Sequence, residues 1–253
     1  MFNWFRQWKR RRTLRDRPIL DVDWNATLER VPLVKALSVD EQARLRAMAT
    51  WFLDEKDFYA AGDLDLTHPM MLTISAQACL PVLDLGYHWL DGWYSIYVYP
   101  GHFRTRREYR DQHGIMQSDH RRLAGEAHSA GGIVLSWNDV VDHVAVDDDG
   151  DNVIIHEIAH KLDMRNGHAD GFPPLRRGMD HGQWSRAMRE AYDHLNRGVR
   201  RGDPEIDPYA ATEPAEFFAV TSEYFFEAPQ TLQRVYPEVY RQLHRFYRGN
   251  IAA

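Results

Sequence analysis

Residues 153–163 read Val-Ile-Ile-His-Glu-Ile-Ala-His-Lys-Leu-Asp, and their spacing predicts a mostly buried helix that carries a polar cluster. In a helix, residues four apart lie one turn above each other, so the imidazoles of His156 and His160 can converge on one metal ion. Glu157 is offset by one position, from which its carboxylate can reach a water on that metal and act as general base. The pattern therefore predicts a metal site, and core histidines satisfied by ordinary hydrogen bonds are the alternative.

A catalytic zinc site needs a third protein ligand and an open position for water. One known arrangement continues with a glycine and a third histidine soon after the helix, but Asp163 and Asn166 occupy those places here. The other arrangement takes a glutamate from a separate downstream helix, and the segment 213–223 offers Glu216 and Glu223, which are seven apart and share a face. Glu216 lies in the first turn and precedes two phenylalanines, where a carboxylate is costly unless paired or metal-bound. We expect Glu216 to be the ligand, with Glu223 or a structural salt bridge as alternatives.

Apolar periodicity and turn signals elsewhere predict an α+β fold in which helices surround a small mixed sheet. Ser38 and Glu41 have the spacing of a capping box, which opens a helix to about Tyr59. Two segments rich in aromatic and β-branched residues are expected to be strands, 94–99 and 133–137. Further helices are expected at 70–80, 153–163, 184–195, 213–226 and 232–247, and a loop at 197–208.

The composition is that of an ordinary globular protein, with 253 residues, 44% of them hydrophobic and 27% charged. No apolar run approaches the ~20 residues that span a bilayer. The single cysteine, Cys79, excludes a disulfide framework and a cysteine-based zinc module, and it favours a reducing compartment. We therefore expect a cytoplasmic protein whose residues 31–253 form a single domain, either undivided or with two lobes flanking an active-site cleft.

The first 30 residues are expected to form a basic and aromatic arm. Residues 1–20 carry seven basic side chains against one acidic one, so the remaining 233 residues carry a net charge of −12. The aromatic residues beside this basic run could rest on a membrane surface, or the arginines could meet nucleic acid. The third alternative is a partly ordered, solvated arm that packs its aromatics on the body. The acidic body argues against direct nucleic-acid binding.

The segments 156–163, 166–167, 214–216 and 222–226 together resemble the Mlc titration factor A family of bacterial zinc metallopeptidases. The resemblance covers about residues 30–247 and is strongest over 150–229. It implies a zincin-like fold of the gluzincin type, related to the anthrax lethal factor catalytic domain, with the metal-binding helix at the base of a cleft.

The resemblance also implies a role for individual residues. The ligands of one Zn²⁺ fall on His156, His160 and Glu216, and the general base falls on Glu157. Tyr209, seven residues before the ligand glutamate, is similar to a tyrosine thought to steady the oxyanion in the related fold.

Two residues are expected to support the ligands. Asp163 stands three residues after His160 and could accept a hydrogen bond from its ring N–H, and a surface aspartate at the helix end is the alternative. Glu223, if it is not the ligand, belongs to the same supporting set. The strand expected at 132–137 could add an extended peptide at its edge, unless it is fully paired in the core.

Two functions remain open at this point. The first is a zinc peptidase in which Glu157 takes a proton from the metal-bound water, and the resemblance implies short peptides and aminopeptidase-type substrates. The second is a regulatory protein that sequesters a transcriptional repressor of sugar-uptake genes and keeps a latent zinc site, because the family is named for that titration. The substitution Glu157→Gln distinguishes the two functions, because it should abolish hydrolysis and leave sequestration of the repressor intact.

Overall fold

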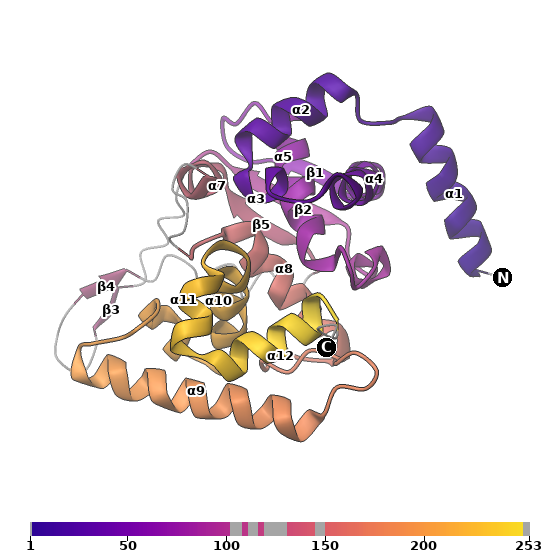
Figure 1. The fold of residues 1–253 in the computed structure, drawn as a ribbon. Coiled ribbons are helices and arrows are strands. Elements are labelled where there is room, and N and C mark those ends of the chain that lie inside the picture. Colours follow the sequence, from indigo (N-terminus) through magenta and orange to yellow (C-terminus); the bar gives the residue numbers. More distant parts are fainter. Residues whose placement is uncertain (1, 102–107, 111–115, 119–130, 145–149, 250–253) are drawn as a thin grey trace.

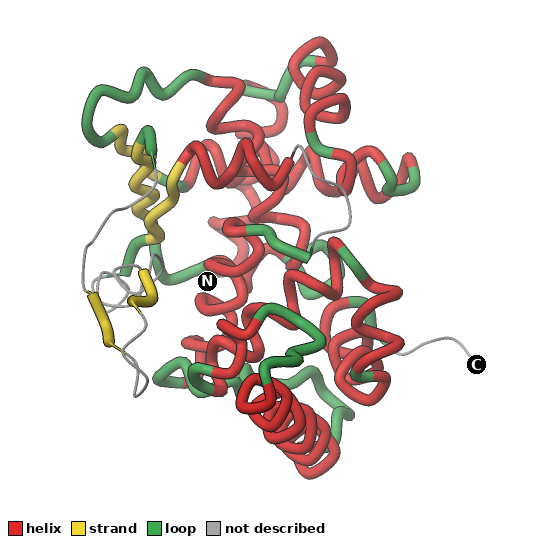
Figure 2. The backbone as a smooth tube through the Cα atoms, turned by 90° about the vertical axis from the view of Figure 1, so that its left-hand side faces the viewer, coloured by secondary structure: helices red, strands yellow, loops and turns green. Residues whose placement is uncertain are grey.

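The computed structural model describes residues 2–101, 108–110, 116–118, 131–144 and 150–249. Figure 1 shows a largely helical molecule, and Figure 2 shows the strands gathered at one side of the helical body. The α+β class is confirmed. The elements are α1 (Phe2–Asp16), α2 (Asp21–Arg30), α3 (Pro32–Lys35), α4 (Val39–Glu55), β1 (Asp57–Ala60), α5 (His68–Cys79), η1 (Leu80–Val82), η2 (Tyr87–Leu90), β2 (Ser95–Tyr99), β3 (Glu108–Arg110), β4 (Met116–Ser118), β5 (Ile133–Ser136), α7 (Trp137–Val144), α8 (Val153–Asp163), η3 (Met164–Asn166), α9 (His181–Arg201), η4 (Pro208–Ala211), α10 (Pro214–Glu227), α11 (Pro229–Val235) and α12 (Pro237–Tyr247).

The main sheet has the order β1-β2-β5, and both pairings are parallel. The expected sheet was mixed; instead, the antiparallel pair β3-β4 forms a second, separate sheet. Strand β1 occupies residues that the sequence assigned to the end of the preceding helix. Strand β1 is short and pairs with β2, and the ring centroids of Tyr59 and Tyr97 stack 5.2 Å apart. These contacts join segments that lie far apart in the sequence, so the helical periodicity of the sequence does not reveal them.

Two further differences from the expected helices have identifiable reasons. Helix α9 continues through Gly198, which sits closely against the backbone of Asp203, and it ends at Gly202 in the left-handed conformation, with φ of 75°. The last expected helix is divided into α11 and α12, because Pro237 follows Tyr236 and proline disfavours the helical conformation in the residue before it.

Helix α8 lies at the centre of the fold, in contact with α10, α5 and β5. Five of its apolar residues are fully buried: Ile154, Ile155, Ile158, Ala159 and Leu162. This burial fixes the rotation of the helix, so the polar side chains of α8 are carried into the interior with it.

Residues 2–16, which belong to the expected basic and aromatic arm, form the regular helix α1, which packs on α4. The expected packing of the arm's aromatics on the body is not found for Trp4, which is 71% exposed, whereas Trp8 is half-covered, at 47% exposure. Among the described residues, no helix is both long and apolar enough to cross a bilayer.

Candidate metal centre

Asn152 sets the start of the helix that carries both histidines. Its side-chain oxygen accepts a hydrogen bond from the backbone N–H of Ile155, which caps α8. Its Nδ2 donates to Gln77 Oε1 at 2.8 Å and to Glu227 Oε1 at 2.6 Å. One buried residue therefore ties the first turn of α8 to both α5 and α10.

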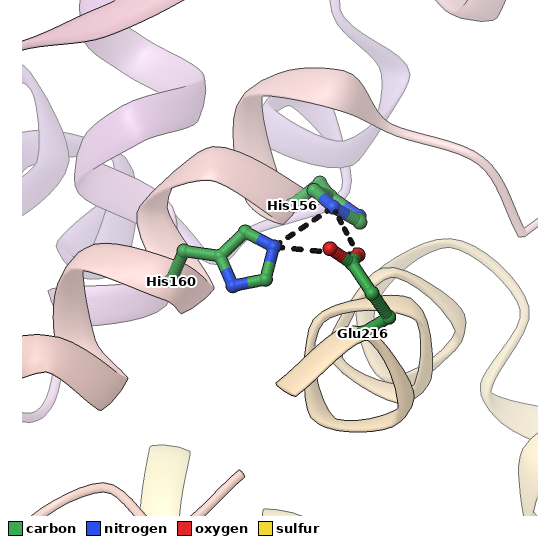
Figure 3. A group of neighbouring side chains, drawn as sticks. All are labelled: His156, His160 and Glu216. Carbon is green, nitrogen blue, oxygen red and sulfur yellow. Dashed lines mark hydrogen bonds and ion pairs between the residues drawn. The ribbon is translucent and has the colours of Figure 1, made fainter. Parts of the chain in front are cut away.

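His156, His160 and Glu216 point their polar atoms at one another between α8 and α10 (Figure 3). The two Nε2 atoms are 3.1 Å apart, and Glu216 Oε2 lies 3.0 Å from His156 Nε2 and 3.4 Å from His160 Nε2. The imidazoles are buried, and the glutamate is nearly so. Helix α10 begins with Pro214 at a tolerated early position, which places Glu216 in its first turn.

Glu223 holds His156 from the other side. Its Oε1 lies 2.7 Å from His156 Nδ1, and its Oε2 accepts the backbone N–H of Asn152 at 2.6 Å. A carboxylate beside Nδ1 favours the tautomer with the proton there, which leaves the lone pair of Nε2 directed at His160 and Glu216. Glu216 and Glu223, two turns apart on α10, thus contact opposite edges of one imidazole.

The charges of this cluster favour a cation. Burial disfavours the imidazolium of His156, but the carboxylates of Glu223 and Glu216 outweigh it and raise its pKa to about 10. For Glu216, burial acts to raise the pKa, yet hydrogen bonds from His156 and His160 hold it well below its ordinary value. A proton on His156 therefore compensates the buried carboxylates, at the position where a metal ion would do the same.

The residues present fit a metal ion. Two ring nitrogens that face each other can satisfy one another only if one of them carries a proton, whereas a cation between them satisfies both and the carboxylate as well. Two imidazoles and a carboxylate form a known ligand set for divalent metals in proteins. Among the described residues, His156, His160 and Glu216 form the group that could hold a metal ion, because their ligand atoms all lie within 4.8 Å of one another.

The other predicted site residues lie around this cluster. Glu157 is buried on α8, and Tyr209, in η4, has its ring 6.2 Å from that of His156 with a 40° tilt between the rings. Asp163 is fully buried, so it is not a surface aspartate, and its Oδ2 accepts the backbone N–H of Gly171 at 2.7 Å. Burial raises the pKa of Asp163 to about 6 despite that hydrogen bond. Its support of His160 stays a prediction.

Two residues that help to position the metal-ligand helices, Asn152 and Gly171, were not predicted from the sequence. Asn152 carries a detectable signal, because asparagine immediately before an apolar helix is typical of an N-cap. Gly171 has a φ of 79°, and a Cβ there would lie 2.5 Å from the carbonyl oxygen of Pro214, so only glycine fits between the loop and the start of α10. A lone glycine in a loop gives no hint of such a contact.

Comparison with known proteins agrees with this geometry. The model of the family described as Glucose-regulated metallo-peptidase M90 matches residues 5–248. The proteins named Mlc titration factor A from Yersinia pestis (strain Pestoides F) and Yersinia pseudotuberculosis serotype O:1b (strain IP 31758) are each 39% identical to the chain over 229 residues, which cover 89% of the chain and 83% of the relative. With nearly its whole length matched, and with three side chains that could hold a metal ion at its centre, the chain belongs to the glucose-regulated metallo-peptidase M90 family.

Proposed function

We propose that this protein is a zinc-dependent peptidase of the aminopeptidase type, with His156, His160 and Glu216 as ligands of one Zn²⁺. The observation that carries the proposal is the convergence of the three ligand atoms. A tetrahedral ion with bonds of about 2.0–2.1 Å has ligand atoms about 3.3–3.4 Å apart. The distances of 3.0, 3.1 and 3.4 Å in the cluster are close to that edge length. The nitrogen and carboxylate ligand set favours zinc over magnesium or calcium.

The surrounding residues supply the acid–base chemistry. Zinc, when bound, contributes Lewis-acid activation of water and of the scissile carbonyl. Glu157 takes a proton from the attacking water and returns one to the leaving amine, and its place next to His156 on α8 supports this role. Tyr209 donates a hydrogen bond to the oxyanion that develops on the carbonyl. Glu223 keeps His156 in the tautomer that binds metal, and Asp163 supports the far end of α8.

The substrates we propose are short, extended peptides. Among the described strands, β5 pairs only with β2, so it is an edge of its sheet, and it contacts α8. A peptide could add to this edge through main-chain hydrogen bonds beside the metal centre. We place the activity in the reducing cytoplasm, in keeping with the buried single thiol of Cys79.

Metal removal tests the proposal. The protein stripped by chelation should lose hydrolysis of aminoacyl-anilides and small peptides, and one equivalent of Zn²⁺ should restore it. Glu216→Gln should lower metal affinity together with activity, whereas Glu213→Gln, three residues away at the exposed start of α10, should bind metal normally. Full activity of the chelated protein would refute zinc-dependent peptidase function.

A second function is supported by the names of the relatives. We propose that the chain also binds a transcriptional repressor of the Mlc type, since relatives that are 39% identical to it carry the name Mlc titration factor A. Repressor capture should persist in Glu157→Gln, because removing a proton acceptor leaves the surface unchanged. Failure of the wild-type protein to bind the repressor would refute this second function and leave the peptidase proposal intact.

A further inference from the structure

Helix α1 has an inner face that fixes it to the body. Arg6 and Arg10 reach Asp91 at 2.7 and 3.1 Å, and Thr13 donates to Asp54 at 3.1 Å. These residues recur at spacings of three and four, so they lie on one side of the helix. The acidic partners belong to α4 and to the loop after η2, so charge complementarity orients α1.

Arg10 is the anchor of this inner face. Its guanidinium also pairs with Glu55 at 3.1 Å and lies 4.5 Å from the ring centroid of Tyr87. Trp51 donates its indole N–H to the backbone carbonyl of Arg10 at 3.1 Å. A partly buried anchor of this kind determines which way the opposite face of α1 points.

The outer face combines exposed tryptophans and arginines. At 100° per residue, the spacings i, i+4, i+7, i+8 and i+11 fall within an arc of roughly 100°. The members of this outer face are all exposed, and they are Trp4, Trp8, Arg11, Arg12 and Arg15.

The outer face keeps a net positive charge. Arg12 and Arg15 share the carboxylate of Asp16, at 3.1 and 2.8 Å, so one negative charge serves two guanidiniums. Arg11 has no acidic partner among the described residues. The guanidinium of Arg12 lies 5.6 Å from the ring centroid of Trp8, so the aromatic and cationic groups form one surface.

We propose that the outer face of α1 binds the surface of a membrane that contains anionic phospholipids. Tryptophan prefers the interface between water and lipid headgroups, and arginine interacts there with phosphate. The tryptophans and arginines share a narrow arc on a convex helix, a shape that a flat lipid surface can cover in full. The negative body opposes contact with any anionic surface, but charges beyond about 8–10 Å are screened at physiological ionic strength. The exposed tryptophans favour a lipid interface over nucleic acid as the partner.

Vesicle binding by the full-length protein tests the proposal. Wild-type protein should co-sediment with vesicles of phosphatidylglycerol and phosphatidylethanolamine, but not with phosphatidylcholine vesicles, and binding should weaken as salt is raised. Removing the three outer arginines (R11Q, R12Q and R15Q together) should lower the affinity ten- to a hundredfold. W4S with W8S should lower it about tenfold and should abolish tryptophan quenching by brominated lipid.

A matched control removes the same charge elsewhere. Arg186, Arg189 and Arg197 are exposed on α9, and replacing all three with glutamine should leave vesicle binding at the wild-type level. The proposal is overturned if wild-type protein ignores anionic vesicles, or if the control loses as much affinity as the outer-face variants. Binding to single- or double-stranded DNA, in place of vesicles, that depends on the same five residues would assign the face to nucleic acid and also overturn it.

Discussion

Glu223 determines how His156 presents Nε2, the nitrogen that we propose to bind zinc, so the charge of Glu223 should matter although Glu223 is not a proposed ligand. Both of its oxygens are engaged, one by His156 Nδ1 and one by the backbone of Asn152. Glu223→Gln keeps the shape, removes the negative charge and should weaken zinc affinity about 10- to 100-fold. Competition with a chromogenic chelator measures this affinity.

Glu227→Gln is the control for that substitution. Glu227 lies one turn further along α10 and contacts Asn152 rather than a histidine, so zinc affinity should stay within about twofold of wild type. Equal losses in both variants would mean that the acidic character of α10, rather than the contact with His156, governs metal binding.

The pKa of His156 predicts that a proton leaves when metal binds. Because the metal-free site raises this pKa to about 10, His156 is protonated at pH 8, and a metal ligand must be neutral. Zinc binding at pH 8 should therefore release about one proton from His156, and apparent affinity should rise about tenfold per pH unit until the pH reaches the pKa. Calorimetry in two buffers of different ionisation enthalpy measures the release, and an enthalpy that does not depend on the buffer would contradict the prediction.

At the scale of elements, the metal centre depends on how closely the loop at Gly171 approaches the start of α10. Gly171→Ala introduces a side chain both at a positive φ and within 2.5 Å of the Pro214 carbonyl oxygen. The substitution should destabilise the protein by about 2–4 kcal/mol and should weaken zinc affinity, because Pro214 precedes Glu216 by two residues. Urea denaturation and the same chelator competition measure the two effects.

Gly178→Ala separates backbone strain from steric overlap. Gly178 has a φ of 90° but no atom within 4 Å of the position a Cβ would take. Its substitution should lower the free energy of unfolding by about 1–2 kcal/mol and leave zinc affinity unchanged. If both alanine variants lose the same stability and bind zinc equally well, the contact with Pro214 has no structural importance.

The sequence predicted those elements whose pattern is local. Helices α8 and α10 show continuous apolar periodicity, and strands β2 and β5 are rich in aromatic and β-branched residues, so their identity follows from neighbours in the chain. Strand β1 was missed because its pairing partner lies far away in the sequence. The end of α9 was placed too early because Gly198 suggested that the helix stops there. The division between α11 and α12 was missed because the effect of Pro237 on the preceding residue was overlooked.

The proposed ligand set could also be written down from the sequence, because the spacing of His156 and His160 and the position of Glu216 are visible there. The network of contacts that supports the ligand set could not be predicted from the sequence. Asn152 and Glu223 are 71 positions apart, and Gly171 meets Pro214 across a loop. Such contacts result from packing α8 against α10, and a one-dimensional pattern contains no measure of that distance.

At the scale of the whole molecule, the fold buries one polar cluster between two helices and holds a separate basic helix against its acidic surface. The candidate metal centre, between α8 and α10, and helix α1 lie in different parts of the structure (Figure 1). Hydrolytic activity and vesicle binding should therefore respond to different substitutions. The loss of zinc should leave vesicle binding unchanged, and the loss of the outer arginines should leave hydrolysis unchanged.

The most direct measurement compares wild-type protein with Glu157→Gln in the hydrolysis of aminoacyl-anilide and peptide substrates at equal zinc content. Glu157 is buried beside His156 without being a proposed ligand, so the variant should keep its zinc and lose roughly 10²- to 10⁴-fold in rate. Wild-type activity that disappears in this variant is the predicted result. A variant that binds zinc fully and hydrolyses the same substrates at the wild-type rate would contradict the proposed mechanism.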